Sequence, residues 1–224
     1  MSRSALFCAL ILLGPALLAQ APPPPAASAK SRVDELYEKF RDAFDEEKPG
    51  ADAALTSLEK EFPGHKLSLD ARKRFEAPLK TLPGKMAPAF RIPSLENPSV
   101  EYSLDTFRGK HVLLEFWATW CPYCVADLPF VHRAWERFKD HEFEILSFSL
   151  DKKAADIAPF RRTKQPMPWK HAFLPGMKAH PIAEAYGAAG IPKYVLVGPD
   201  GRILASDGDL RGEKLEKTLE AFLK

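Results

Sequence analysis

The sequence has little cysteine, no apolar run of membrane-spanning length and almost no net charge. Only three of its 224 residues are cysteine, which excludes a small scaffold held together by disulfides. A multi-span membrane protein is excluded because its helices would each need about 20 consecutive apolar residues. The 32 basic and 30 acidic side chains leave a formal charge of +2, so we expect no nucleic-acid partner.

What the sequence does contain is the composition of a folded protein. Hydrophobic residues make up 46% and charged residues 28%, which argues against a disordered or collagen-like chain. The length fits one good-sized domain, or one domain with a short additional piece.

The N-terminus is typical of an export signal. Arg3 precedes Ala5–Ala19, an uncharged stretch of fifteen residues, which is the size of a signal-peptide core. We expect residues 1–21 to be removed on export to the periplasm, and an uncleaved membrane anchor is the alternative. Cleavage would remove Cys8 and leave two cysteines in an oxidising compartment.

The next part of the chain predicts a spacer followed by helices. Residues 22–30 (PPPPAASAK) are rich in proline and predict an exposed spacer. Residues 31–82, which we call the helical segment, show apolar residues at three- and four-residue steps. Three helices are expected there, over Arg32–Glu47, Asp52–Phe62 and Leu69–Leu79. Packing onto the following domain is favoured over binding of a partner.

Residues 83–224 alternate between strand-like and helical patterns, which predicts a layered α/β domain. The lead-in Pro83–Lys110 has room for an additional hairpin. The expected strands are Val112–Trp117, Phe143–Leu150, Trp169–Phe173, Tyr194–Val197 and Arg202–Ala205. The expected helices run to about Lys139 after the first strand, then over Ala154–Arg162, His180–Tyr186 and Glu213–Leu223.

The chemistry of this domain is expected at Cys121-Pro122-Tyr123-Cys124, directly after a buried strand and at the start of a helix. Two cysteines at this spacing can close a small disulfide ring. The partial positive charge of a helix N-terminus stabilises a thiolate and lowers its pKa. Cys121, at the exposed end, is then the nucleophile, and Cys124 is the shielded thiol that resolves a mixed disulfide.

Two other uses of this cysteine pair are a zinc site and a structural disulfide. A zinc site needs a second Cys or Cys/His pair at ligand spacing, and the sequence has none. A purely structural disulfide remains an alternative, although so short a loop constrains the unfolded chain very little. We expect no metal and no cofactor other than the redox-active disulfide itself.

Several motifs together resemble the thioredoxin superfamily, and more closely its exported TlpA/ResA-type thiol–disulfide oxidoreductases. The resemblance covers Gly84–Lys224 and leaves out the helical segment. It implies a thioredoxin-like fold, with a central mixed sheet flanked by helices and an additional N-terminal hairpin. The motifs are Glu115–Cys124 (EFWATWCPYC), Asp127-Leu-Pro129, Gly190-Ile-Pro192, Met86–Phe90 (MAPAF) and Ser103–Lys110 (SLDTFRGK).

The resemblance also implies a substrate-binding surface around the cysteine pair. Pro192 corresponds to a cis-proline that faces the pair, so Ile191 and Pro192 would offer backbone groups to an extended substrate segment. An ordinary strand entry with a trans bond is the alternative. Trp120, Pro122 and Tyr123 are the other expected substrate contacts.

Two carboxylates are expected to assist the thiols. Glu115 matches the buried acid of thioredoxins, where desolvation raises the pKa and allows proton transfer to and from Cys124. The alternative for Glu115 is an edge-facing or ion-paired side chain. Asp127 matches the acid that the family keeps near its pair, in place of the commoner glutamate, and could instead be a first-turn residue favoured by the helix dipole.

The function implied by the resemblance is reduction of disulfides in exported proteins, such as apocytochrome c or a copper-site protein. Electrons would come from a membrane-bound thioredoxin-like donor. The alternative function is oxidation or isomerisation of protein disulfides, because Pro122-Tyr123 is a dipeptide typical of glutaredoxins.

Three further classes fit less well. A peroxidase of this fold would carry proline where Glu115 stands, and a Sco-type copper protein separates its cysteines by three residues. An inert binding module would be expected to lose a cysteine or Pro192, and this chain keeps all three.

Overall fold

The computed structural model describes residues 26–46, 48 and 50–223. The expected signal peptide, residues 1–21, lies outside the described residues, as does the first part of the expected spacer. Among the described helices, none combines the length and the apolar character needed to cross a membrane.

Three helices form the N-terminal part of the described chain, as the sequence predicts. They are α1 (Ala26–Asp45), α2 (Ala51–Glu61) and α3 (Lys66–Lys80). The expectation that all of residues 22–30 form a non-helical spacer is wrong, because α1 already begins at Ala26. Alanine and lysine, which make up most of residues 26–30, are strong helix formers.

The helical segment has a hydrophobic core of its own. Val33, Leu36 and Phe40 project from one face of α1 and are buried against α2 and α3. The rings of Phe40 and Phe75 meet edge to face with centroids 5.1 Å apart. These helices therefore stabilise one another through side-chain packing, which short helices need in water.

The rest of the chain is organised around a five-stranded sheet of order β5-β4-β3-β6-β7. β3, β4 and β5 are parallel to one another, and β6 and β7 are antiparallel to their neighbours. Parallel neighbours need crossover connections, which α4 and α5 provide. The strands are β3 (His111–Trp117), β4 (Phe143–Ser149), β5 (Lys170–Phe173), β6 (Lys193–Val197) and β7 (Ile203–Ser206).

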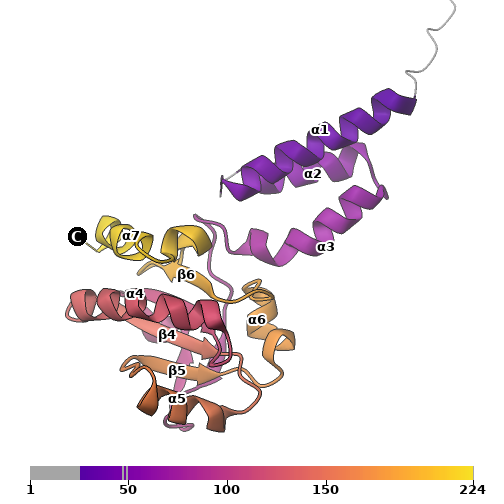
Figure 1. Cartoon of the computed structure of the whole chain (residues 1–224). Coiled ribbons are helices and arrows are strands. Elements are labelled where there is room, and N and C mark those ends of the chain that lie inside the picture. The colour runs from indigo at the N-terminus through magenta and orange to yellow at the C-terminus, as the bar shows by residue number, and fades with distance from the viewer. Residues whose placement is uncertain (1–25, 47, 49, 224) are drawn as a thin grey trace, which may run out of the picture.

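Helices cover both faces of this sheet (Figure 1). The side chains of α4 and α7 form a core with one face, and α6 and a hairpin of β1 and β2 form a core with the other. The hairpin predicted in the lead-in is therefore confirmed. The bounds are β1 (Arg91–Pro93), β2 (Glu101–Ser103), α4 (Pro122–Phe138), α5 (Ile157–Thr163), α6 (Pro181–Ala185) and α7 (Lys214–Phe222). Short 3-10 helices occupy Leu104–Phe107, Ala154–Asp156, Met177–Ala179 and Asp207–Leu210.

The segment 84–87 joins the helical segment to the sheet. Gly84 N donates to Ile203 O, and Ile203 N donates back to Lys85 O, each at 2.8 Å. Ala87 N donates to Gly201 O at 3.0 Å. Residues 84–87 thus run along the outer edge of β7 and pair its backbone groups.

Replacement of Phe40 by alanine tests the core of the helical segment. Phe40 is fully buried, so Phe40→Ala should lower the free energy of unfolding of this segment by about 3–5 kcal/mol. Chemical unfolding followed by helical circular dichroism measures the change. Leu69→Ala, at a side chain that is 59% exposed, is the control and should cost far less. Equal losses in the two variants would contradict this packing.

Candidate active site

The cysteine pair lies at the turn from β3 into α4. Cys121 is the N-cap residue of α4, and Pro122, at its first helical position, has the backbone angle that a helix start requires. Cys121 and Cys124 form a disulfide with a Cα–Cα distance of 5.3 Å. The Cys124 backbone N–H donates to Cys121 Sγ at 3.2 Å. This N–H would also stabilise a Cys121 thiolate, because the first turn of a helix has no intrahelical acceptor for it.

Both sulfurs are shielded in the disulfide form. Cys121 keeps an exposed fraction of only 3%, and Cys124 is fully buried. The expectation that Cys121 stands at an exposed end is therefore wrong for this form. Its sulfur folds back over the first turn of α4 and lies 3.7 Å from the carbonyl oxygen of Ile191. Two aromatic side chains beside it are open to solvent, Trp120 at 50% and Tyr123 at 72% exposed.

The Ile191–Pro192 peptide bond is cis, as the resemblance implies, and the trans alternative is wrong. Both residues are half-buried and immediately precede β6. The Ile191 carbonyl reaches the redox pair from a loop that is distant in sequence. The structure thus brings together Trp120, the two cysteines and the Ile191–Pro192 loop.

A buried aspartate, which the sequence analysis did not single out, holds the turn before Cys121. The carboxylate of Asp151 accepts hydrogen bonds from the Thr119 backbone N–H at 3.2 Å and from the Thr119 hydroxyl at 2.6 Å. Ser149 Oγ donates to the same carboxylate at 2.8 Å. Because Asp151 follows β4, it fixes the end of β3 to the end of the neighbouring strand.

Glu115 is fully buried in the middle of β3, the central strand, which excludes the edge-facing alternative. Its side chain points to the sheet face that α4 covers, since Leu113 and Trp117 on the same side of β3 pack in one core with Cys124 and Leu128. Its hydrogen-bond partners are hydroxyls rather than a cation. Ser147 Oγ donates to Oε2, and the Tyr194 hydroxyl donates to Oε1 at 3.5 Å.

Burial raises the pKa of Glu115 from its ordinary 4.5 to about 7. The hydrogen bonds from Ser147 and Tyr194 oppose this rise, and the nearby charge of Asp127 adds to it. A carboxyl group with this pKa exchanges protons readily near neutral pH, which fits the proton-transfer role expected for it.

Ser147 and Tyr194 are site residues that sequence reasoning missed. Ser147 Oγ also accepts from Trp169 Nε1 at 2.7 Å, so hydrogen bonds run from Trp169 through Ser147 to Glu115. The strand register places Ser147 and Tyr194 on either side of Glu115. Only Ser147 left a signal in the sequence, because it is a polar residue in the middle of FEILSFSL, a stretch that is expected to form a strand.

Asp127 lies in the second turn of α4 and not in the first, so the first-turn alternative is wrong. Its mostly buried carboxylate accepts a hydrogen bond from Arg211 Nε at 3.0 Å. Arg211, which sequence reasoning also missed, follows the 3-10 helix after β7. Asp127 thus connects the interior near Glu115 to a surface cation.

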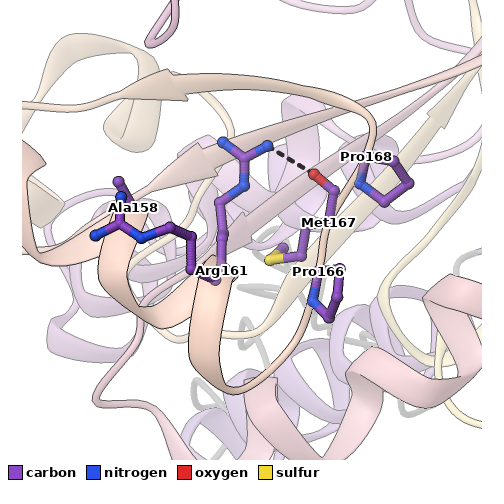
Figure 2. Close-up of a pocket in the computed structure, with 6 residues that line it drawn as sticks. Ala158, Arg161, Pro166, Met167 and Pro168 are labelled. Carbon is purple, nitrogen blue, oxygen red and sulfur yellow. Dashed lines mark hydrogen bonds between the residues drawn. The ribbon is translucent and has the colours of Figure 1, made fainter.

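Figure 2 shows a cavity that is separate from this site. It lies between α5 and the loop before β5, where Arg161 Nη2 donates to Met167 O at 2.7 Å. The lining residues are Ala158, Arg161, Arg162, Pro166, Met167 and Pro168. It contains none of the predicted site residues.

A disulfide on the first turn of a helix, beside a cis-proline loop and on the same sheet face as a buried acid, defines the class of thioredoxin-fold dithiol proteins. The sequence agrees with this class. The model of the AhpC/TSA family matches residues 83–206, and the chain belongs to that family.

Individual relatives are thiol–disulfide oxidoreductases. The chain is 32% identical over 142 residues to the thiol-disulfide oxidoreductases ResA of Bacillus thuringiensis subsp. konkukian and Bacillus cereus, which covers 63% of this chain and 76% of each relative.

Among solved structures, the thioredoxin domain of a thiol-disulfide oxidoreductase from Bacteroides vulgatus matches with 31% identity and a TM-score of 0.56. This match covers 63% of this chain and 98% of that domain. A putative thiol:disulfide interchange protein DsbE from Chlorobium tepidum matches with 27% identity and a TM-score of 0.54, over 63% of this chain and 98% of that protein. The thioredoxin-like fold is confirmed, and the protein is a thiol–disulfide oxidoreductase.

The buried carboxyl group makes stability depend on pH. Glu115 binds a proton more tightly in the folded than in the unfolded chain between pH 4.5 and 7, so the free energy of unfolding falls as the pH rises through this window. Across the whole window the free energy of unfolding falls by about 3 kcal/mol. Urea unfolding of the oxidised protein at pH 5 and pH 8 should show this fall in the wild type and not in Glu115→Gln.

Comparison of the wild type with Glu115→Gln isolates the contribution of Glu115 to the pH dependence of stability. Burial lowers the pKa of His171 to about 3, which makes stability rise with pH between 3 and 6.5, but His171 is present in both proteins. An identical pH dependence in wild type and variant would show that Glu115 titrates as an ordinary carboxyl group.

Proposed function

We propose that this protein works outside the cytoplasm and exchanges thiols and disulfides with protein substrates through Cys121 and Cys124. The observation that carries this is the Cys121–Cys124 disulfide on the first turn of α4, 3.7 Å from the Ile191 carbonyl. The exposed rings of Trp120 and Tyr123 and the backbone of Ile191 and Pro192 supply a contact surface for a polypeptide beside the reactive sulfur.

In the reducing direction the reaction has two steps. The Cys121 thiolate attacks one sulfur of a substrate disulfide, forms a mixed disulfide and releases the other substrate sulfur as a thiolate, which takes up a proton. The Cys124 thiol then loses its proton and attacks Cys121 Sγ. The second substrate thiol leaves, and the Cys121–Cys124 disulfide is restored, so two electrons have passed to the substrate.

Glu115 serves the second step as the proton acceptor for Cys124. It lies on the sheet face beneath the helix that carries Cys124, and a pKa of about 7 leaves a large fraction ionised at neutral pH. Cys124 is fully buried in the disulfide form, so a carboxylate on the same sheet face supplies a proton acceptor from within the protein. The charge of Asp127, which is paired with Arg211, raises the pKa of Glu115 further.

We further propose that the physiological direction is reduction. Candidate substrates are disulfides of apocytochrome c or of a copper-site protein, with electrons supplied by a membrane-bound thioredoxin-like donor. The likeness to the ResA and DsbE proteins and the N-terminal stretch Ala5–Ala19 support this proposal. A protein-disulfide oxidant or isomerase is the second candidate, favoured by the Pro122-Tyr123 dipeptide.

The reduction potential of the Cys121–Cys124 pair separates the two directions. Equilibration of the mature protein with glutathione and dithiothreitol buffers should give a value near the ~−270 mV of thioredoxin or below it. A value near the ~−120 mV of a strong oxidant would reverse the direction. Cys121→Ser and Cys124→Ser are the controls and should show no reversible two-electron titration. Absence of a titration in the wild type would contradict the proposed function and leave a structural disulfide or a binding module.

Glu115→Gln should slow the second step. Loss of a positioned base costs at least about 100-fold, so a mixed disulfide on Cys121 should resolve about 100-fold more slowly at pH 7. In the wild type the rate should rise with pH through about 7, and the variant should lack this inflection. Stopped-flow measurement of thiol release gives both rates. The rate of the first step is measured in Cys124→Ser with and without Glu115→Gln, and it should be the same in both. A slower first step with Glu115→Gln would show that Glu115 serves Cys121 instead.

A further inference from the structure

The helical segment contains none of the residues assigned to the redox site, and the family match at residues 83–206 leaves it out. Its last helix, α3, nevertheless ends against the part of the domain where α6 leads into β6 (Figure 1). Residues 186–193, which we call the cis-proline loop, make this connection and include Ile191 and Pro192.

The beginning of the cis-proline loop packs directly on α3. Gly187 has a φ of +66°, and a Cβ atom added there would lie 3.1 Å from the backbone nitrogen of Pro78 and 3.2 Å from its Cδ. The last turn of α3 and the loop are therefore in close proximity, and both the positive φ and the tight contact favour glycine at position 187. The preceding residue, Tyr186, donates its hydroxyl to Pro88 O, in the segment between α3 and β1, at 2.6 Å.

The end of the loop is held from the same side by a buried cation. Lys193 directly follows Pro192, and only 5% of it is exposed. Its Nζ donates to Thr81 Oγ1 at 3.3 Å and pairs with Asp207 Oδ2 at 2.6 Å. Thr81 is itself buried and is the C-cap residue of α3. A buried ammonium group needs its partners, so these contacts fix the side chain of Lys193, while its backbone is paired with Phe116 of β3.

Both ends of the cis-proline loop are thus held by the last turn of α3, at Gly187 through Pro78 and at Lys193 through Thr81. Between these ends the loop has no regular secondary structure, and an irregular loop must be ordered before it can offer its backbone to a substrate.

We propose that the last turn of α3 is a positioning element of the redox site, which orders the cis-proline loop for an extended polypeptide that carries the substrate cysteine. This proposal rests on the proposed function, in which Ile191 and Pro192 bind the substrate backbone. It gives the helical segment a role in substrate recognition, and Pro78, Thr81 and Lys193 are positioning residues that act through the loop and do not touch the substrate.

Two disulfides with the same leaving group test the proposal. One is the symmetrical disulfide of thionitrobenzoate, and the other is an extended peptide with one cysteine joined to thionitrobenzoate. Cys121 of the reduced full-length protein attacks each of them and releases coloured thionitrobenzoate, after which Cys124 releases the second thiol and closes the protein disulfide. Only the peptide offers a backbone that the cis-proline loop can bind.

Thr81→Val and Lys193→Met remove the two ends of the hydrogen bond between Lys193 and Thr81, and Lys193→Met also removes the ion pair with Asp207. Each variant has a control. Thr163→Val removes a hydroxyl that bonds to a proline carbonyl at the end of another helix, α5, as Thr81 does in α3. Lys80→Met removes a lysine beside Thr81 whose ion pair with Glu76 is exposed. Thr81→Val is the milder change and keeps the test valid if Lys193→Met does not fold.

We expect the rate constant for the peptide to fall about 5- to 10-fold in Thr81→Val, the effect of one lost hydrogen bond on an ordered loop. It should fall at least as much in Lys193→Met, which also loses the ion pair with Asp207. The rate with the small disulfide and the reduction potential should stay at wild-type values, and both controls should react like the wild type. A purely structural role would lower the melting temperature without changing the ratio of the two rates.

The outcomes separate this inference from the proposed function. Equal rate losses for both disulfides, or an unchanged peptide rate in folded variants, would overturn the positioning role and leave the proposed function intact. A wild-type protein that reduces the small disulfide without preferring the peptide would overturn the positioning role as well. A wild-type protein that reacts with neither disulfide would overturn both.

Discussion

The structure of the site depends on the unsatisfied N–H groups at the start of α4. The chain leaves β3 and enters α4 at Pro122, so Cys121 is the N-cap residue. Its sulfur accepts a hydrogen bond from the Cys124 N–H. The turn before it cannot move freely, since Asp151 at the end of β4 binds both the backbone and the side chain of Thr119. The geometry of two neighbouring parallel strands therefore determines where the reactive sulfur lies and which partial charge it meets.

The buried acid is the second requirement of the site, and its environment is shared among three elements. Ser147 on β4 and Tyr194 on β6 donate hydrogen bonds to Glu115 from either side, while the charge of Asp127 on α4 raises its pKa. Hydroxyl partners satisfy the carboxylate without neutralising it, so its pKa stays near neutrality and is not depressed as it would be beside a cation. An acid with this pKa suits a protein that must both release and take up protons at one thiol.

The sequence indicated the sheet, the hairpin and the three N-terminal helices, because each has a clear apolar period or a turn signal. The motif around Cys121 similarly pointed to the cis bond before Pro192, through its resemblance to known proteins. Ser147 and Arg211 could not be predicted in this way, because their roles depend on strand register and on a contact across 84 positions of the chain. The burial of Cys121 depends on a distant carbonyl, that of Ile191, and the early start of α1 reflects local helix propensity that four preceding prolines concealed.

The pairing of residues 84–87 with β7 has a consequence for how the chain can be divided. The other outer strand, β5, also has a partner, because Leu95 N donates to His171 O at 2.8 Å. A shortened chain that begins after residue 88 would keep the partner of β5 but lose that of β7. Its free strand edge would then be open to another copy of the chain, and strand-to-strand association and aggregation would follow. A fragment that keeps the outer edge of β7 paired therefore has to include Gly84, even though the redox residues begin only at Glu115.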